Sequence, residues 1–371
     1  MRNKKIMEDE LLYRVALTLV PDLGSIKAKL LLEKFGAASA IFKAKKKEIA
    51  ATEGIGEITA RSLKQWDAFC DAEAEILFME KNHVRSLFLS DKDYPQRLLH
   101  CYDPPTLLYY RGHCDLNASR IISIIGTRNH TDYGKQVTEQ LIAALQQEQV
   151  LIISGLAFGI DAIAHKNALQ NGLQTVAVLG HGLATVYPFQ HKHLAKEIEA
   201  QGALLTEFPG YTKPDKHNFP RRNRIVAGMA DATIVIETAN KGGSMITAEL
   251  AYNYNRDLFA IPGKITDSKS SGCLQLIKQN KAILLTCAEQ LLETLGWTEK
   301  KKIIKKQKEL FIELSREETI VVNLLKEKEC MAIDELYLQS GLTSSSVAAA
   351  ILSLEIQNVI AALPGKMYRL L

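Results

Sequence analysis

The sequence of 371 residues has no paired cysteines and no strong excess of either charge, and each absence narrows the class of protein. Its 6 cysteines are scattered and form no Cys-x-x-Cys pair, which disfavours both a zinc site and a disulfide framework. Isolated cysteines of this kind are typical of reduced, mostly buried thiols in the cytoplasm. The formal net charge is only +4, so any nucleic-acid site must be a local patch.

Long apolar runs are also missing. No stretch approaches the roughly 20 apolar residues that span a bilayer. The basic residues 1–5 are followed by acidic residues 8–10, where a signal peptide needs its apolar segment. We therefore expect a cytoplasmic protein with no membrane partner. The length predicts two or three domains, and 47% hydrophobic residues can fill a core.

The standard nucleotide-binding loops do not occur. Residues 180–185 read Gly-His-Gly-Leu-Ala-Thr and lack the third glycine of Gly-x-Gly-x-x-Gly, and there is no Walker-type Gly-Lys-Ser/Thr. A nicotinamide cofactor or ATP is therefore disfavoured, and we expect no cofactor. Four histidines match no zinc spacing, so we expect no metal site either. They are His165, His181, His191 and His193.

Short apolar runs alternate with glycine-containing turns and helical stretches between residues 120 and 285. This alternation predicts a doubly wound, mostly parallel α/β sheet. The predicted strands are 121–125, 151–154, 175–179, 203–206, 233–236, 258–261 and 282–285. Residues 91–112 contain several prolines, and we expect them to form a rigid lead-in segment without regular structure.

Residues 218–263 carry the strongest functional pattern. Three arginines stand near its start: Arg221, Arg222 and Arg224. A predicted strand at 233–236 follows, and then a glycine turn at 241–244 leads into a helical stretch. Strand, glycine turn and helix together present backbone N–H groups to an anion, and ligands bind beyond the carboxyl ends of parallel strands. We therefore expect a phosphate-rich ligand, with the arginines on a loop at the same edge.

The first 85 residues look helical and contain a weak repeat, in which residues 23–28 match residues 55–60. Each copy resembles the helix-hairpin-helix or SAM-like turn of many DNA-binding proteins, in which free amides face a phosphate. The tight turns of a plain helical bundle are the alternative. That alternative is favoured for the second copy, because Glu53 and Glu57 would repel phosphate.

Beyond Trp297, a lysine-rich run at residues 300–308 predicts a solvated basic linker, which we place at residues 298–313. Residues 314–371 predict a small domain of three helices and two short strands. The helices are 317–328, 333–340 and 344–357, and the strands flank Pro364-Gly365. This order resembles a winged helix, but the recognition helix has no Lys or Arg for DNA, so we expect an interaction or regulatory module.

Five groups of residues occur in a fixed order along the central region. They are Ser154-Gly155-Leu156-Ala157 with Gly159-Ile160-Asp161 and His165; Val178-Leu179-Gly180 with Gly182-Leu183 and Tyr187-Pro188; Phe219-Pro220 with Arg222-Asn223-Arg224; Gly243-Ser244 with Ile246-Thr247-Ala248; and Ile261-Pro262-Gly263. In combination they resemble the DNA-processing protein A family (DprA, also called Smf). The resemblance implies a Rossmann-like single-stranded-DNA-binding domain at residues 86–297, between a helical domain at 1–85 and a winged-helix-like domain at 314–371.

Members of that family protect incoming single-stranded DNA during natural transformation and load the RecA recombinase onto it. The resemblance therefore implies single-stranded DNA and RecA as partners, a homodimer, and no catalytic residue. It implies that Arg128 and Lys216 bind phosphate and that Phe219 stacks on a base. Cations beside an aromatic platform suit this ligand because they bind backbone and bases with little sequence preference.

The predicted DNA-binding residues are Gly126, Thr127, Arg128, Phe158, Lys216, Phe219, Arg221, Arg222, Asn223, Arg224, Gly242, Gly243 and Ser244. Three alternatives stay open. Phe219 could pack in the core instead. Arg222 and Arg224 could brace the loop by pairing with Asp161 or Glu207. Phe158 stands where many relatives have a basic residue, so a phosphate contact is either missing there or replaced by stacking.

An enzyme is the competing interpretation. Residues 242–249 faintly resemble the Pro-Gly-Gly-x-Gly-Thr-x-x-Glu signature of nucleotide phosphoribohydrolases, N-glycosidases that share this kind of sheet. The proline is replaced by Asn240-Lys241, the third glycine is missing, and the spacing to Glu249 is stretched. No matched pair of carboxylates for glycoside chemistry is evident elsewhere.

Overall fold

The computed structural model describes residues 2–298, 314–328 and 330–371. The chain forms two compact units, the first made of Met1–Tyr254 and Leu258–Ala288, the second of Asn255–Asp257 and Glu289–Leu371. The predicted basic linker lies outside the described residues except for Thr298. The domain boundaries at 85/86 and 313/314 stay predictions.

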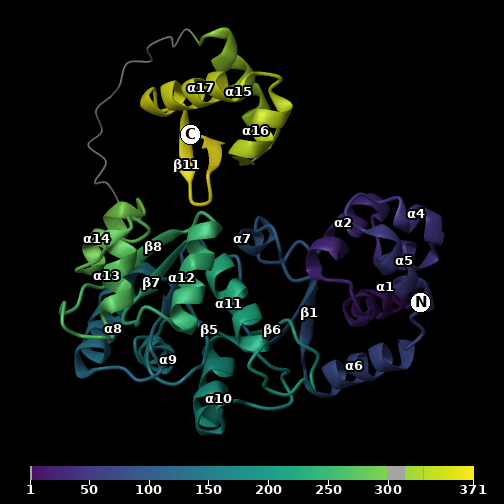
Figure 1. Ribbon diagram of the computed structural model, residues 1–371, viewed down its shortest axis with the longest axis horizontal. Helices are drawn as coiled ribbons and strands as arrows, with labels where there is room; N and C mark the ends of the chain where they lie inside the picture. The colour runs from purple at the N-terminus through teal and green to yellow at the C-terminus, as the bar shows by residue number, and fades with distance from the viewer. Residues whose placement is uncertain (1, 299–313, 329) are drawn as a thin grey trace. The chain divides into compact units, whose positions relative to one another are not determined.

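A sheet is the centre of the first unit, and nine strands belong to it within the described residues (Figure 1). Their order is β1-β2-β6-β5-β4-β3-β7-β8-β9. They are β1 (Arg85–Phe88), β2 (Leu107–Gly112), β3 (Ile121–Ile125), β4 (Leu151–Ser154), β5 (Thr175–Val178), β6 (Ala203–Thr206), β7 (Ala232–Val235), β8 (Asp257–Ala260) and β9 (Ile283–Leu284). Strands β3 to β7 run parallel, as do β8 and β9, while β1 and β2 are antiparallel.

The predicted mostly parallel sheet is confirmed. Strands β3, β4 and β6 have the predicted bounds, β5 ends one residue early, and β7, β8 and β9 differ by one residue at each end. All residues of β3 and β4 are buried, as expected for apolar runs in a sheet covered on both faces.

The expectation that residues 91–112 lack regular structure is wrong. They contain α7 (Gln96–Leu99) and β2, which pairs with both β1 and β6. The prolines of this segment precede α7 and β2, so β2 keeps all its backbone donors and can sit inside the sheet. Strand β1 was also missed, because its four residues are half polar and show no clear pattern.

Helices cover both faces of this sheet (Figure 1). In β5, Val176 and Val178 lie in one core cluster and Ala177 lies in another, because successive residues of a strand point to opposite faces. The first face packs against α11 (Asn218–Gly228), α12 (Gly243–Asn253) and α13 (Ser271–Lys278). The other face packs against α9 (Ile160–Gln170) and α10 (Lys192–Gln201). Helix α8 (Asp132–Ala144) packs against α9.

The N-terminal helices share a core cluster with the sheet, in which Val15 and Leu31 join Tyr109 and Leu179. These helices are α1 (Arg2–Leu19), α2 (Ser25–Phe35), α3 (Ala38–Lys43), α4 (Lys46–Ala50), α5 (Gly56–Gln65) and α6 (Phe69–Lys81). The two repeated turns begin α2 and α5, and they touch, since Lys27 Nζ lies 2.8 Å from Thr59 Oγ1. This contact favours the structural interpretation of the repeat.

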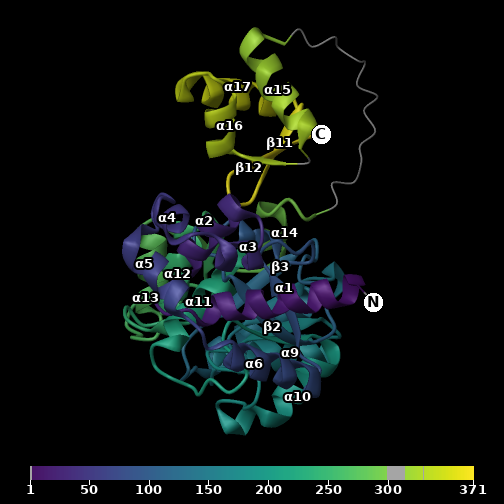
Figure 2. The ribbon, with the colours of Figure 1, turned by 90° about the vertical axis from the view of Figure 1, so that its right-hand side faces the viewer.

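The second unit contains the predicted winged helix (Figure 2). The helices of the winged helix are α15 (Arg316–Glu327), α16 (Ile333–Gln339) and α17 (Ser344–Ile356). Helix α14 (Ala288–Thr294) precedes them in the chain. Three antiparallel strands follow the order β10-β12-β11, and they are β10 (Met331–Ala332), β11 (Ile360–Leu363) and β12 (Met367–Leu370). The predicted helices and the two strands at Pro364-Gly365 are confirmed, and β10 is an addition. None of the helices described has the length and apolar character to cross a membrane.

Tyr94 joins the two parts of the lead-in segment that precede and follow α7. Its side chain is fully buried, and its hydroxyl donates to the Pro105 carbonyl at 2.6 Å. We expect Tyr94→Phe to lower the free energy of unfolding by about 1–2 kcal/mol, because the buried carbonyl loses its donor. Denaturant titration measures this change. Tyr102→Phe is the control, since the Tyr102 side chain is 57% exposed, and equal losses in the two variants would contradict the account.

Candidate nucleic-acid interface

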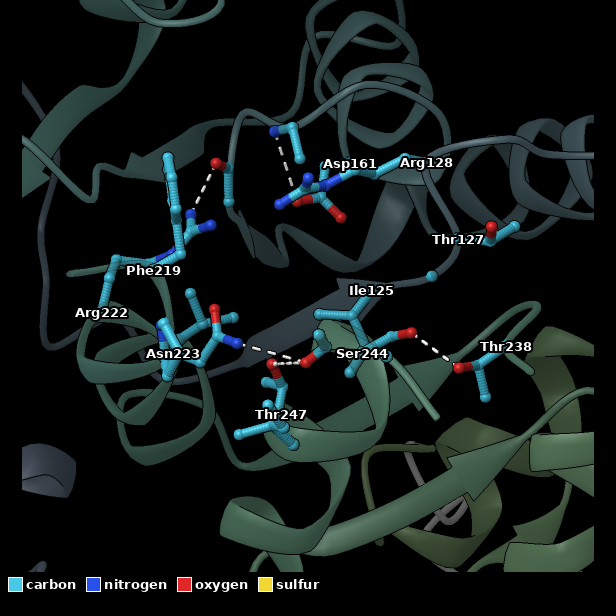
Figure 3. Close-up of a pocket in the computed structure, with 18 of the residues that line it drawn as sticks. Ile125, Thr127, Arg128, Asp161, Phe219, Arg222, Asn223, Thr238, Ser244 and Thr247 are labelled. Atoms are coloured by element: carbon cyan, nitrogen blue, oxygen red, sulfur yellow. Dashed lines mark hydrogen bonds between the residues drawn. The ribbon is translucent and has the colours of Figure 1, made fainter. Parts of the chain in front are cut away.

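A pocket of about 790 Å³ opens beyond the carboxyl ends of β3, β4 and β7 (Figure 3). Its walls come from the loops after β3, β4 and β7, from the loops after β5 and β6, and from α11 and the start of α12. The chain proceeds from β3 through β4 and β5 in one direction and places β7 on the opposite side of β3. The pocket therefore lies at the switch point of the sheet, where ligands of open α/β folds bind.

The structure brings most predicted site residues to this pocket. They are Gly126, Thr127, Arg128, Lys216, Phe219, Arg222, Asn223, Gly242, Gly243 and Ser244. Three others lie outside its lining, namely Phe158, Arg221 and Arg224. The side chain of Phe158 is 44% exposed, and it follows the pocket residue Ala157 along the chain.

Two predicted cations of the pocket are free to meet a phosphate. Arg128 and Lys216 are exposed and form no ion pair with any carboxylate in the described part of the chain. The Arg128 guanidinium instead lies 5.8 Å from the centre of the Phe219 ring. A third exposed cation, Lys241, also lines the pocket and was not predicted. The pocket thus combines exposed positive charge with an aromatic face.

The start of α12 supplies backbone donors. The first N–H groups of a helix have no partner within it, and here Gly243 and Ser244 begin α12 at the pocket wall. Asn223 Nδ2 donates to the Gly243 carbonyl at 3.2 Å, and Ser244 Oγ lies 2.7 Å from Thr238 Oγ1 (Figure 3). Asn223 therefore positions the glycine turn, and its amide is already engaged.

Phe219 is half-buried in the first turn of α11. A Cβ on Gly180 would lie 2.7 Å from Phe219 Cδ1, so one side of the ring packs closely on that glycine. The ring also lines the pocket, and the Tyr187 ring stands 5.9 Å away at 39°. Phe219 therefore packs on the protein and still offers an aromatic surface to the pocket.

The arginines lie on a helix, so their expected place on a loop is wrong. Pro220 is compatible with this helix because it falls in the first turn, where its missing N–H has no partner to lose. Besides Pro220, four residues of α11 line the pocket, and these four share one face: Phe219, Arg222, Asn223 and Val226. Counted from Phe219, the other three follow at three, four and seven residues, which is the spacing of one helical face. Arg221 and Arg224 occupy a different face, and both reach Glu207.

Arg222 is buried beneath the pocket. Its Nη1 donates to the carbonyl of Gly155 at 2.5 Å and also to that of Val178. Burial lowers the pKa of Arg222 to about 10, although the Asp161 carboxylate opposes that shift. Burial likewise raises the pKa of Asp161 against the attraction of Arg222. These contacts favour the bracing role of Arg222.

Arg224 and Glu207 form a buried pair away from the pocket, with 10% and 7% of their side chains exposed. Arg224 Nη2 lies 2.5 Å from Glu207 Oε2, and Arg224 also donates to the Asp103 carbonyl. Burial acts to lower the pKa of Arg224, but Glu207 overcomes it and the pKa is raised. The exposed Arg221 lies 3.3 Å from Glu207 and above the Phe208 ring. Arg224 therefore connects α11 to Glu207 and Asp103, which is a structural role.

The histidines are engaged by the protein itself. His165 is fully buried against Thr175 Oγ1, and burial lowers its pKa to about 3. His181 accepts the Tyr187 N–H at Nε2, and His191 Nδ1 lies 2.9 Å from the Leu156 carbonyl. No cluster of three or more metal-ligating side chains occurs in the segments that the structure describes.

The geometry also bears on the enzyme alternative. Both carboxylate oxygens of Glu249 lie 2.7 Å from Lys281 Nζ, and Glu249 does not line the pocket. The carboxylates that do line it are Asp161, buried beside Arg222, and Asp215, which accepts the His217 N–H. The glutamate on which the phosphoribohydrolase resemblance depends therefore lies outside the candidate site.

Sequence reasoning missed Tyr187, whose half-exposed side chain lines the pocket beside Phe219. Tyr187 belongs to one of the conspicuous residue groups, but it was given no role. An aromatic residue just before a proline, in a loop that follows a buried strand, is a signal that could have identified it.

Comparison with known proteins gives consistent matches. Residues 85–296 match the family described as DNA recombination-mediator protein A, and residues 309–366 match the DprA winged helix domain. Protein Smf of Synechocystis sp. is 31% identical over 96% of this chain and 98% of that protein. DNA processing protein DprA of Streptococcus pneumoniae is 42% identical over 56% of this chain and 73% of that protein.

Two solved structures are also similar. DNA processing protein A from Streptococcus pneumoniae has a TM-score of 0.66 at 33% identity, covering 76% of this chain and 95% of that one. The Helicobacter pylori DNA processing protein A has a TM-score of 0.53 at 31% identity, covering 57% of this chain and 95% of that one. The latter structure is described as showing a single-stranded DNA binding mode.

The Arg224–Glu207 pair yields a stability test. We expect Glu207→Gln to lower the free energy of unfolding by about 3 kcal/mol, because it leaves a buried guanidinium without its main partner. Denaturant titration measures the change. Glu249→Gln breaks the more exposed pair with Lys281 and should cost less than about 1 kcal/mol. Equal effects of the two substitutions would show that the buried pair is not a special support of the site.

Proposed function

Because this chain belongs to the DNA recombination-mediator protein A family (DprA, or Smf), we propose that it is a single-stranded DNA-binding protein of natural transformation and DNA recombination. One observation carries the assignment to the pocket: Arg128, free of ion pairs among the described residues, stands over the partly buried ring of Phe219, and the equally free Lys216 lines the same pocket at the switch point of the sheet. A phosphate chain and an unpaired base are the ligand that this combination fits.

Each part of the pocket has a distinct task in this proposal. Arg128 and Lys216 neutralise phosphates, and the first N–H groups of α12 donate to phosphate oxygens. The Phe219 ring stacks on one base. Arg222 and Asn223 do not need to touch DNA, because they hold the surrounding loops through carbonyls of the backbone. Nothing in this set reads the edge of a base, so the binding has little sequence preference.

Stacking on Phe219 also favours single strands over duplex. A base can lie on an aromatic side chain only when it has left the stack of a double helix, and leaving costs a few kcal/mol. A strand that is already single does not pay that cost. The phosphate contacts alone would serve both forms, so the ring supplies the discrimination.

The finer parts of the proposal rest on the family. We propose that the protein protects incoming strands, loads the RecA recombinase onto them, and does so as a homodimer in the cytoplasm. The description of the matched family as a recombination mediator supports a recombinase partner. We also propose that the protein acts by binding and not by catalysis, which the engaged carboxylates of the pocket support.

Two substitutions separate charge from stacking. Arg128→Ala should weaken binding and reduce the slope of log affinity against log salt by about 0.7 to 1, because one phosphate contact releases its counterion. Phe219→Ala should weaken binding by about 1–3 kcal/mol and leave that slope nearly unchanged. Fluorescence titration with an oligothymidylate at several salt concentrations measures both, and Lys278→Ala, an exposed lysine of α13, is the control.

Both variants must first keep the thermal transition of the parent protein, because loss of a packed ring also creates a cavity. If folded Phe219→Ala binds like the parent, the ring only packs on Gly180 and the stacking role is wrong.

The winged helix generates a second prediction. The exposed side of α17 includes Ala348, Ala349 and Leu352, and α17 has no Lys or Arg. We therefore expect a chain ending at Trp297 to keep nearly all of its affinity for single-stranded DNA. Titration of a truncated protein that is folded checks this expectation. Loss of binding would move the main site into the residues removed.

A further inference from the structure

The loop after β5 separates the pocket from a second hollow. Tyr187 lines the pocket, whereas Val186 and Phe189 line a hollow of about 350 Å³. Residues 183–186 and Phe189 therefore form one wall of the second hollow, and Tyr187 faces the first. Residues of this one loop therefore line both hollows.

The second hollow has the same chemical character as the pocket. Phe189 is 73% exposed, and Lys192 Nζ lies 5.7 Å from the centre of its ring. Lys192 and Lys196 stand one turn apart on α10, both are exposed, and neither pairs with a carboxylate within the described ranges. Arg111 adds a third cation, balanced by Glu199 at 2.9 Å. The hollow therefore keeps free positive charge beside an exposed aromatic ring.

Tyr187 connects the two hollows. Its half-exposed ring stands next to that of Phe219, and Phe189 follows it two residues later. The Tyr187 backbone N–H donates to His181 Nε2 at 3.2 Å, and His181 Nδ1 lies 2.8 Å from the Gly182 carbonyl. Burial lowers the pKa of His181, which keeps the ring neutral and able to accept this hydrogen bond. The tyrosine is therefore held in place by the loop that carries it.

We propose that the hollow of Phe189, Lys192 and Lys196 is a second nucleotide-binding subsite, occupied by the same single strand after it crosses Tyr187. The inference rests on the proposed function of the first pocket. Aromatic rings on which successive bases stack, beside cations that follow the backbone, are the standard construction of an extended single-strand site. A larger hollow adjoins this one and shares Arg111, Lys196 and Glu199 with it. That hollow adds both Arg85 and Glu80, so the free positive charge is confined to the Lys192 and Lys196 side.

The experiment compares two oligothymidylates, one of about six nucleotides that fills the first pocket and one of about twenty that reaches both subsites. Phe189→Ala should weaken binding of the long strand roughly fivefold to a hundredfold, without changing its salt slope. Lys192→Gln with Lys196→Gln should reduce the salt slope for the long strand by about 1.4, since each phosphate contact on a single strand contributes about 0.7. Neither variant should change binding of the short strand.

Matched controls lie elsewhere on the first unit. Tyr252→Ala removes an exposed ring that also has a lysine nearby, Lys281 at 5.5 Å. Lys166→Gln with Lys278→Gln removes two exposed lysines outside both hollows. These variants should bind both strands as the parent protein does, and all variants are checked for an unchanged thermal transition.

The outcomes separate the two proposals. If the parent protein binds neither strand, the proposed function fails. If it binds both strands equally well, or if the Phe189 and lysine variants bind the long strand like the parent, the second subsite is overturned and the first pocket stands. If these variants keep the DNA affinity of the parent protein, the hollow is instead a candidate surface for binding a protein. If the variants weaken binding of the short and the long strand equally, the subsite is overturned too. The lysines would then act only through the long-range electrostatic potential of the protein.

Discussion

The buried guanidinium of Arg222 is the interaction on which the site depends. An isolated buried charge costs several kcal/mol, and here the Asp161 carboxylate and the carbonyls of Gly155 and Val178 offset that cost. These partners belong to three segments, the end of β5, the loop after β4 and the start of α9. One side chain of α11 therefore fixes the edge of the sheet. It also requires glycine at position 155, where a Cβ would lie 2.2 Å from Arg222 Nη1.

With that edge fixed, the cations of the site divide into two groups. Arg222 and Arg224 are buried and bound to acceptors of the protein, whereas Arg128, Lys216 and Lys241 are exposed and free of ion pairs across the described residues. In the proposed complex a phosphate would gain most from the second group, because these charges would have only water and counterions to release. The first group contributes by holding the exposed residues in place, which reduces the ordering cost of binding.

The sequence was sufficient for the positions of the parallel strands along the chain and for most of the pocket, because buried β-branched runs and glycine turns are local signals. It was insufficient for β1 and β2, since an antiparallel addition next to β6 depends on distant pairing. It also misplaced the arginines. Once residues 218–228 are known to be helical, the spacing of Phe219, Arg222 and Asn223 separates pocket residues from Arg221 and Arg224. Tyr187 was missed because its neighbour Phe219 comes from another segment.

The central claim is that this pocket binds single strands through free cations and an aromatic ring. A fluorescence titration of the whole protein with single-stranded and duplex oligonucleotides of the same length, repeated over a range of salt concentrations, tests it most directly. The account predicts tighter binding of the single strand, with log affinity falling linearly and steeply as log salt rises. Affinity that does not respond to salt, or a clear preference for duplex, would contradict it.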